Sequence, residues 1–457
     1  MSRAEFAGKR FAVIGLGVSG VAMCEAAVAV GAIPVAFDEK PSDVQRVMEA
    51  ADRLQAKGIE VVTGWHGELE GDFDWVLVSP GLPPGHPVMS AWAGKIMGEI
   101  EFAYRIAEAP ILAITGTNGK STTTVMLYKC LQDHGAVLCG NIAGSGYPEH
   151  VLTESALTTP ADGVLVAEIS SAQLETVIDW CPRVATITNI TEDHQDRYRS
   201  FEKYKTAKLN MFRNMGEGQV IVLNLDEESL DLEWAGSVGF IGFCPDGGSG
   251  ENAQTRRTDD ALWFSGEEVK FVDLPFIGEM NFANAMTAWE MACAYVGEPT
   301  MGMLRRLLEF RPLENRMEPL GARDGVQVVN NSMCTNPMAV VKSCESLPQK
   351  LHILMGGNTK EGDYSSLQKY LHIAGHKVYL YGDDSGYLNS LLGGGYPEYS
   401  DLRSAFVYAV SVAEFGEVVM LAPGCASSGP YANFKERGSA FKQIAKEWLE
   451  DEEIRKS

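Results

Sequence analysis

The chain contains, from Ile114 to Thr124, the stretch Ile114-Thr-Gly-Thr-Asn-Gly-Lys-Ser-Thr-Thr-Thr124, and this stretch decides the fold of its central part. It follows a short apolar run, Ala109–Ile114, that predicts a buried strand, and it precedes Val125–Leu131, which predicts a helix. A glycine-rich turn between a strand and a helix points backbone N–H groups at an anion. Lys120 adds a positive charge for phosphate, and the Ser121 hydroxyl is suited to Mg²⁺. A turn that only caps the helix is the plain alternative, and the spacing differs from a usual Walker loop, which would need glycine at Ile114.

The size and charge of the chain limit its fold and its partners. A chain of 457 residues is too long for one hydrophobic core and predicts two to four domains. A hydrophobic content of 45% and a charged content of 22% are typical of soluble globular proteins. The net charge of -23 argues against nucleic acid or an anionic membrane surface as the main partner.

Cysteine usage and the N-terminal sequence indicate the compartment. The nine cysteines are scattered without a C-x-x-C pair, which favours free thiols in a reducing compartment over disulfides or a zinc site. The first residues, Met1–Phe6, lack the apolar core of a signal peptide, and no stretch of ~18 apolar residues could insert in a membrane. We therefore expect a cytoplasmic protein.

The N-terminal segment has the pattern of a dinucleotide-binding unit. A strand-like run, Lys9–Ile14, leads into the turn Gly15-Leu-Gly-Val-Ser-Gly20 and an alanine-rich helix, and the next strand, Ile33–Phe37, ends at Asp38. A further strand is expected at Asp74–Ser79. The turn could hold any nucleotide diphosphate, including NAD in a dehydrogenase, or it could simply let helix and strand pack closely.

Strand-like and helix-like runs alternate along the rest of the chain, which predicts parallel α/β sheets. The second segment, from about 110 to about 311, contains strands ending near Glu168 and Ile190 and a surface loop at Pro245–Glu251. The third segment starts at about Leu313. Its expected strands are Val326–Val329, His352–Met355, Val378–Tyr381 and Val418–Leu421.

Four candidate functional residues follow strands of the second segment. Ligands of open parallel sheets bind beyond the carboxyl ends of the strands, where Glu168 and His194 are expected together with Lys120 and Ser121. Glu168 is suited to hold the Mg²⁺ of a nucleotide, although it could also be an exposed acid that caps a helix. His194 could equally be a solvated turn residue.

Lys208 is unusual because it falls on the apolar face of a predicted helix. Ser200 is a candidate N-cap, and Tyr204, Met211 and Phe212 mark the face that carries Lys208. Burial would lower the pKa of its amine, and a neutral amine can act as a base or take up CO₂ to become a carbamate. The alternative is that the stem lies along the apolar surface while the head reaches water.

Four motifs in this order resemble those of the Mur ligases: Ile114–Thr122, Glu168–Glu175, Asn189–Tyr198 and Tyr204–Lys208. The resemblance covers nearly the whole chain and implies three α/β domains. The expected domains are an N-terminal Rossmann-like domain, 1–109, a central P-loop ATPase-like parallel sheet, 110–312, and a C-terminal Rossmann-like domain, 313–457. It also implies an ATP-dependent ligase that adds glutamate, with D-glutamate favoured, to UDP-N-acetylmuramoyl-L-alanine through an acyl phosphate.

The resemblance implies the site residues as follows. The catalytic residues are Lys120, His194, Lys208 and Arg316. ATP is expected at Gly116, Thr117, Asn118, Gly119, Lys120, Ser121, Thr122, Asn281, Asn284, Arg316 and Asn331. The uridine-diphosphate substrate is expected at Val18, Ser19, Asp38, Ser79, Pro80, Gly81, Asn141 and His194, and glutamate at Thr335, Lys360, Ser427 and Phe434. Two Mg²⁺ ions are expected at Ser121, Glu168, His194 and Lys208, the last as a carbamate.

Several positions depart from the family pattern. Met280 and Asn315 stand where the family usually has histidine, Asn331 replaces its aspartate, and Met333 replaces its lysine. The loop Ser428–Tyr431 also differs. These changes leave the phosphate chemistry intact and leave the handedness of the amino acid open. We expect a monomer. We also expect its domains to close on the substrates, because Arg316 and Lys360 belong to a different segment from the phosphate loop.

Two alternative functions stay open beside the D-glutamate ligase. One is the same chemistry with L-glutamate. The other is a weakly active nucleotide-binding scaffold, which only Asn331 and Met333 favour. Folylpolyglutamate synthase, a related ligase, usually lacks the N-terminal Gly-x-Gly unit.

Overall fold

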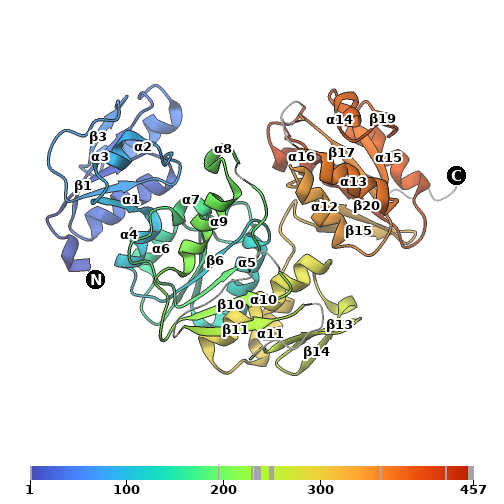
Figure 1. Cartoon of the computed structure of the whole chain (residues 1–457), viewed down its shortest axis with the longest axis horizontal. Helices are drawn as coiled ribbons and strands as arrows, with labels where there is room; N and C mark the ends of the chain where they lie inside the picture. The colour runs from blue at the N-terminus through green and yellow to red at the C-terminus, as the bar shows by residue number, and fades with distance from the viewer. Residues whose placement is uncertain are drawn as a thin grey trace. The chain divides into compact units, whose positions relative to one another are not determined.

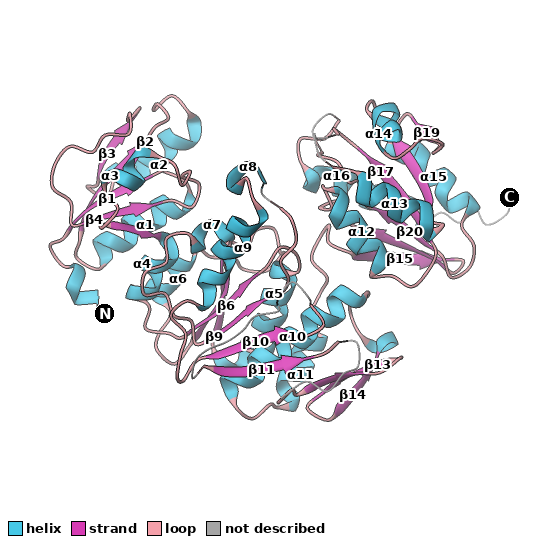
Figure 2. Cartoon of the chain, viewed as in Figure 1, coloured by secondary structure: helices cyan, strands magenta, loops and turns pink. Residues whose placement is uncertain are grey.

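The computed structural model describes residues 3–193, 195–227, 230, 238–245, 252–359, 363–427 and 430–450. The chain forms two compact units. Unit 1 comprises Met1–Phe271 and Ala283–Glu309, and unit 2 comprises Val272–Phe282 and Phe310–Ser457. Helices and strands alternate along most of both units, as predicted for an α/β protein (Figures 1 and 2).

Unit 1 begins with a five-stranded parallel sheet in the order β3-β2-β1-β4-β5. Its strands are β1 (Arg10–Ile14), β2 (Ile33–Asp38), β3 (Glu60–Thr63), β4 (Trp75–Val78) and β5 (Ile96–Gly98). Its helices are η1 (Arg3–Phe6), α1 (Val18–Ala29), α2 (Gln45–Gln55), α3 (Pro87–Ala91) and α4 (Glu99–Ile106). The strand order reverses between β1 and β4, which is the kind of position where open α/β sheets bind ligands.

The second sheet of unit 1 has six parallel strands in the order β11-β10-β9-β6-β8-β7. They are β6 (Ile111–Thr115), β7 (Ala136–Gly140), β8 (Val164–Glu168), β9 (Val184–Ile187), β10 (Val220–Asn224) and β11 (Gly239–Phe243). The helices after them are α5 (Lys120–Cys130), η2 (Gln132–His134), α6 (Leu152–Thr158), α7 (Ser171–Leu174), α8 (Gln195–Tyr198), α9 (Phe201–Leu209) and η3 (Asn210–Phe212). Helix α5 packs against β6, β7 and β8.

A small antiparallel sheet in unit 1 departs from the expectation of parallel sheets throughout. It contains β12 (Thr255–Arg257), β13 (Ala261–Phe264) and β14 (Glu267–Lys270). Ser265 and Gly266 join β13 to β14, both with positive φ (50° and 94°), as in a two-residue hairpin turn. After it come η5 (Phe271–Asp273), α10 (Glu279–Val296) and α11 (Met301–Leu308). The loop predicted at 245–251 lies outside the described residues except for Pro245.

Unit 2 contains a six-stranded sheet in the order β15-β16-β20-β17-β18-β19, in which only the β15–β16 pair is antiparallel. The strands are β15 (Glu318–Arg323), β16 (Val326–Asn330), β17 (Leu351–Gly356), β18 (Lys377–Tyr381), β19 (Glu398–Tyr399) and β20 (Val418–Leu421). The helices are α12 (Pro337–Glu345), α13 (Ser365–Ala374), α14 (Ser385–Leu391), α15 (Leu402–Val412) and α16 (Phe434–Glu450). The four predicted strands are confirmed, and β15 and β19 are additional.

One apolar cluster explains why the first two sheets share a compact unit. Phe11 and Val13 of β1, Phe102 of α4 and Leu165 of β8 belong to the same buried cluster. A separate cluster around Ile353 fills one face of the sheet in unit 2. The boundaries at residues 109 and 312 remain predictions.

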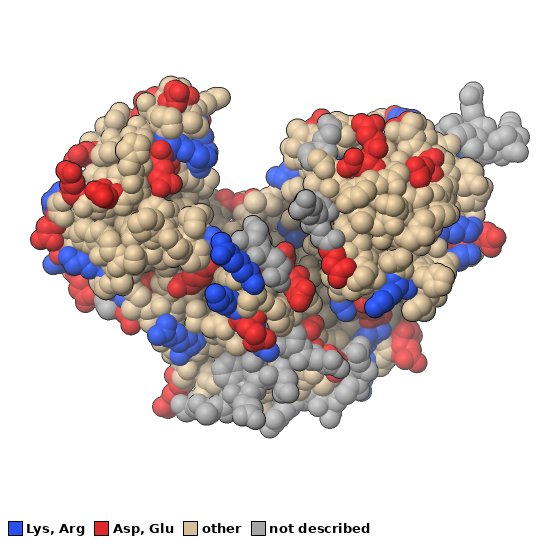
Figure 3. All heavy atoms as spheres, turned by 45° about the horizontal axis from the view of Figure 1, so that its top comes forward, with Lys and Arg blue, Asp and Glu red and all other residues tan. Residues whose placement is uncertain are grey.

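The charged side chains of the described residues are spread over the face drawn in Figure 3 rather than gathered in one basic patch. In Figure 3, basic side chains lie singly or in small groups among acidic and neutral ones. Among the residues described, no helix is both long enough and apolar enough to cross a membrane.

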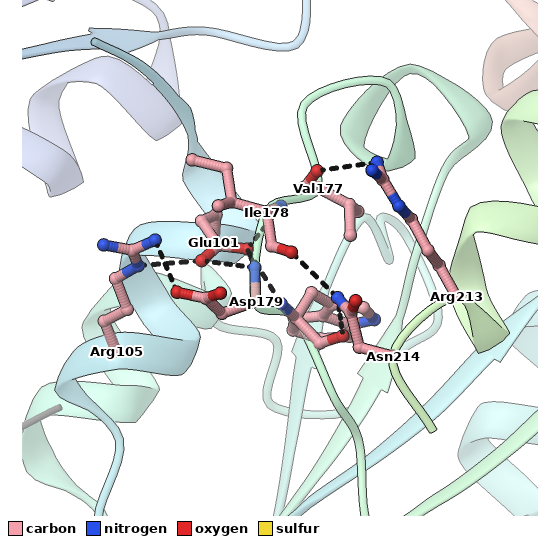
Figure 4. A network of polar contacts seen from close by, with 8 residues as sticks. Glu101, Arg105, Val177, Ile178, Asp179, Arg213 and Asn214 are labelled. Atoms are coloured by element: carbon pink, nitrogen blue, oxygen red, sulfur yellow. Dashed lines mark hydrogen bonds and ion pairs between the residues drawn. The ribbon is translucent and has the colours of Figure 1, made fainter. Parts of the chain in front are cut away.

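Glu101 ties α4 to the segment that precedes β9 (Figure 4). Its carboxylate is fully buried and accepts backbone N–H groups from Ile178, Asp179 and Trp180 at 2.9–3.0 Å. Arg105 donates to the same carboxylate at 2.7 Å and also pairs with Asp179 at 2.8 Å. A single acid therefore satisfies four donors from two elements far apart in the sequence.

We expect Glu101→Gln to lower the free energy of unfolding by about 2–3 kcal/mol, because the amide NH₂ would face donors and leave at least one buried N–H unpaired. The measurement is the urea midpoint of the full chain. Glu108→Gln is the control, since Glu108 is 55% exposed and forms only a surface pair with Arg3 at 3.2 Å. Equal midpoints for both variants would contradict the prediction.

Candidate active site

The phosphate loop lies where β6 ends and α5 begins. Gly116 has φ 150° and Gly119, the N-cap of α5, has φ 81°. A Cβ at Gly116 would collide with Thr188 Oγ1, and one at Gly119 would collide with Asn284 Oδ1. Glycine is thus required at both positions by backbone conformation and by space, and the predicted strand–turn–helix arrangement is confirmed.

Residues after β9 hold the loop in this shape. Asn189 Oδ1 accepts from Asn118 N at 2.9 Å, and Thr188 Oγ1 donates to Asn118 O at 2.6 Å. Thr117 N donates to Asn189 O at 2.9 Å, and Lys120 Nζ donates to Thr117 O at 2.9 Å. The loop is therefore preformed at the N-terminus of α5, and the N-terminus of a helix favours an anion. No sequence pattern indicated this role of Thr188.

Ser121 and Glu168 meet at the carboxyl end of the same sheet. Ser121 Oγ donates to Glu168 Oε2 at 2.6 Å, and Asn141 Nδ2, just after β7, donates to Oε1 at 3.3 Å. Glu168 is 3% exposed, so the interpretation of an exposed capping acid is wrong. A hydroxyl and a carboxylate side by side are oxygen ligands of the kind that Mg²⁺ prefers.

Lys208 is buried beside the phosphate loop, so the interpretation with its head in water is wrong. Ser200 caps α9 by accepting from Lys203 N, as predicted, and Lys208 is 1% exposed. Its Nζ donates to Gly116 O at 2.7 Å and lies 4.7 Å from the centre of the Tyr204 ring. Burial, and then the nearby charge of Lys120, lower the pKa of the Lys208 amine to about 6. Burial therefore favours the neutral form of this amine.

Two further residues predicted for ATP, Asn281 and Asn284, lie on helix α10. Asn284 accepts from Thr123 Oγ1 at 3.1 Å and so lies beside the loop, whereas Asn281 belongs to unit 2 and donates to Ile277 O at 2.8 Å. His194 and Lys360 lie outside the described residues.

Six of the residues predicted for the uridine-diphosphate substrate lie at the carboxyl edge of the first sheet, whereas Asn141 follows β7 of the second sheet: the six are Val18, Ser19, Asp38, Ser79, Pro80 and Gly81. Asp38 ends β2, and its carboxylate accepts from Leu16 N at 2.7 Å and Lys40 N at 2.9 Å. It thereby fixes the glycine-rich turn that leads into α1, where Val18 is 75% exposed. Ser79 follows β4, next to that turn, because its backbone N donates to Ile14 O at 3.0 Å.

The residues predicted for glutamate follow strands of unit 2 or start its last helix. Thr335 follows β16, Ser427 follows β20, and Phe434 begins α16. Arg437, which the sequence did not single out, is fully buried among them. Its guanidinium donates to Ser332 O at 2.9 Å and to Gly356 O and Cys425 O at 3.3 Å. This one cation therefore joins the end of β17 to the loops that follow β16 and β20.

Comparisons with known proteins agree with this geometry. Residues 114–292 match the family model of the Mur ligase middle domain. A UDP-N-acetylmuramoylalanine–D-glutamate ligase of Thermoanaerobacter sp. (strain X514) is 33% identical over 97% of this chain and 99% of its own. The enzyme of the same name from Shigella sonnei (strain Ss046) is 31% identical, with 97% and 99% covered.

Solved structures with low sequence identity share the fold. A MurF ligase from Thermotoga maritima, solved in complex with ADP, aligns with a TM-score of 0.59 at 15% identity and covers 97% of this chain and 96% of its own. A pseudomurein peptide ligase type C from Methanothermus fervidus aligns with a TM-score of 0.55 at 17% identity, with 96% and 100% covered. Together with the near full-length relatives, these matches show that the chain belongs to the Mur ligase family.

Proposed function

We propose that this chain is an ATP-dependent ligase that joins D-glutamate to UDP-N-acetylmuramoyl-L-alanine in the cytoplasmic synthesis of peptidoglycan precursors, and that it acts as a monomer. The names of its near full-length relatives support this substrate pair. The observation that most directly supports ATP-dependent chemistry is the 2.6 Å hydrogen bond between Ser121 of the phosphate loop and the buried Glu168.

The proposed reaction has two steps. A carboxylate oxygen of UDP-N-acetylmuramoyl-L-alanine bonds to the γ-phosphorus of ATP, and the bond to the β,γ-bridging oxygen breaks to release ADP. The amine of glutamate then attacks the acyl carbon and loses a proton while phosphate leaves, which forms the amide. Both steps bring anions together, so positive groups aimed at the phosphoryl oxygens stabilise the transition states. Lys120 and Arg316 are proposed to supply this charge.

The residues around the loop suit a magnesium ion. The Ser121 hydroxyl and the Glu168 carboxylate are adjacent oxygen donors, and Glu168 is buried at a strand end. Mg²⁺ bound there would neutralise phosphate charge and orient the γ-phosphoryl group. A second ion is proposed at His194 and Lys208.

Lys208 is proposed to act as a carbamate. Its neutral amine would bond to the carbon of CO₂ and lose one proton, which gives an anion with two oxygens. Burial to 1% exposure and the 2.7 Å contact with Gly116 O support this role, because they hold the amine in one place beside the loop. The uridine-nucleotide and glutamate sites are proposed at the residues predicted for them above, together with Asn281 and Asn284 on the adenine side.

The decisive experiment is mass analysis of the product formed from UDP-N-acetylmuramoyl-L-alanine, ATP and Mg²⁺ with each enantiomer of glutamate. We expect one glutamyl residue to be added from D-glutamate, with one ADP released for each product. Product from L-glutamate alone would favour the L-specific ligase. Nucleotide binding without phosphate release, with either enantiomer, would favour the scaffold.

Two lysines of α5 provide a matched pair for this assay. Lys120→Ala should abolish product formation, because Lys120 begins the helix at the loop. Lys129→Ala should retain it, because Lys129 points to Gln132 and Glu309 near the other end of the helix.

A further inference from the structure

The backbone on both sides of Arg316 has an unusual conformation. Asn315 has φ 65° and Met317 has φ 44°, both in the left-handed region that residues other than glycine rarely adopt. Arg316 N donates to Leu313 O at 3.1 Å, so the turn is tight. Such a conformation persists only where surrounding contacts impose it.

Those contacts come mainly from the end of β16 and the loop that follows it. Asn330 Nδ2 donates to Asn315 Oδ1 at 3.0 Å, and Met333 N donates to Asn315 O at 3.0 Å. On the other side, Met317 N donates to Asn331 Oδ1 at 3.2 Å. The two residues that flank Arg316 are thus each held by an asparagine of the segment 330–331.

Asn331 has both ends of its amide engaged inside unit 2. The residue is 6% exposed, and its Nδ2 donates to Ser343 Oγ at 2.8 Å. Ser343 donates its only hydroxyl proton to Ala339 O at 2.6 Å, so toward Asn331 it can only accept. An aspartate at 331 would bond to Ser343 only if the Ser343 hydroxyl gave up its bond to Ala339 O, so the substitution changes this local network. The amide of Asn331 therefore suits both partners at once, because its oxygen accepts from Met317 N and its NH₂ donates to Ser343 Oγ.

We propose that Asn331 is a positioning residue that acts through Met317 to aim the Arg316 side chain, rather than a contact to the ribose of ATP. This inference rests on the proposed function, which assigns Arg316 to the γ-phosphate.

The test is a double-mutant cycle of Asn331→Asp and Arg316→Ala, with kcat and KM for ATP measured in the glutamate-adding assay. We expect Asn331→Asp to lower kcat about tenfold and to leave KM for ATP within about twofold. In the Arg316→Ala background, Asn331→Asp should cause no further loss, because the arginine through which it acts is already gone. Ser343→Ala should lower kcat in the same direction by a smaller factor, and it serves if Asn331→Asp fails to fold.

Asn389→Asp is the control for a general loss of stability. The partly buried amide of Asn389 also donates two hydrogen bonds, to Tyr396 O at 3.0 Å and to Glu398 Oε1 at 2.6 Å. Asn389 lies near β19, at the opposite edge of the sheet from β15. Asn389→Asp should lower the thermal midpoint without changing kcat.

Three outcomes would overturn the inference. A raised KM for ATP with unchanged kcat in Asn331→Asp would indicate a ribose contact. If the double mutant lost kcat by the product of the two single-mutant factors, Asn331 would not act through Arg316. The proposed function would not be affected by that result. Parental kcat in Arg316→Ala alone would overturn the role proposed for Arg316 and this inference with it.

Discussion

Lys208→Ala is expected to lower kcat by at least about 10²–10³-fold, the loss seen when a preorganised electrostatic contact is removed from an active site. The side chain is buried beside the phosphate loop and its amine contacts Gly116 O at 2.7 Å. If the amine is carbamylated, formate or acetate should restore part of the activity of Lys208→Ala, because a small carboxylate can replace the missing anion in the cavity. The measurement is phosphate release with and without added carboxylate.

Two further variants separate the carbamate from a simple lysine. Lys208→Arg keeps N–H donors at this position but cannot form the carbamate, so it should be inactive. Lys203→Ala removes an exposed lysine of the same helix and should have parental activity. An active Lys208→Arg enzyme, or a lack of rescue while ATP and Mg²⁺ still bind, would argue against the carbamate.

Arg437→Met is expected to destabilise unit 2 by about 4 kcal/mol or more, because each buried carbonyl left without a partner costs ~1–3 kcal/mol. The guanidinium is fully buried and donates to Ser332 O, Gly356 O and Cys425 O. Methionine fills part of the volume but offers no donor. Hydrogen exchange should therefore accelerate in α16 and in the strands β16, β17 and β20, whereas the sheets of unit 1 should be unaffected.

Arg403→Met is the matched control for Arg437→Met. Arg403 pairs with Glu447 at 2.6 Å, but both side chains are about half exposed, at 54% and 45%. Such surface pairs contribute about 0–1 kcal/mol, so its exchange pattern should match that of the parent. Equal protection of α16 in the two variants would contradict the role given to Arg437.

Two strands of unit 2, β15 and β19, were not predicted from the sequence, although the turn after β15 has a hairpin sequence. The hairpin of β15 and β16 turns at Asp324 and Gly325, and both residues have positive φ (51° and 78°). Asp-Gly is a strong marker of a two-residue hairpin turn. β19 has only two residues, too few for any alternating pattern. The grouping of the first two sheets into one compact unit was also not predictable, because it depends on how buried side chains from both sheets pack.

Some features of the candidate site also follow from the local sequence, whereas others depend on the tertiary structure. The sequence determined the strand–loop–helix at Gly116–Ser121 and the apolar face that carries Lys208, because glycine sterics, helix capping and residue periodicity act between neighbours in the chain. Only the tertiary structure decided that Lys208 reaches Gly116, that Ser121 meets Glu168, and that Asn331 pairs with Met317 and Ser343. These contacts depend on which strands lie side by side and in which register, and that is set by burial of the whole sheet rather than by any local stretch.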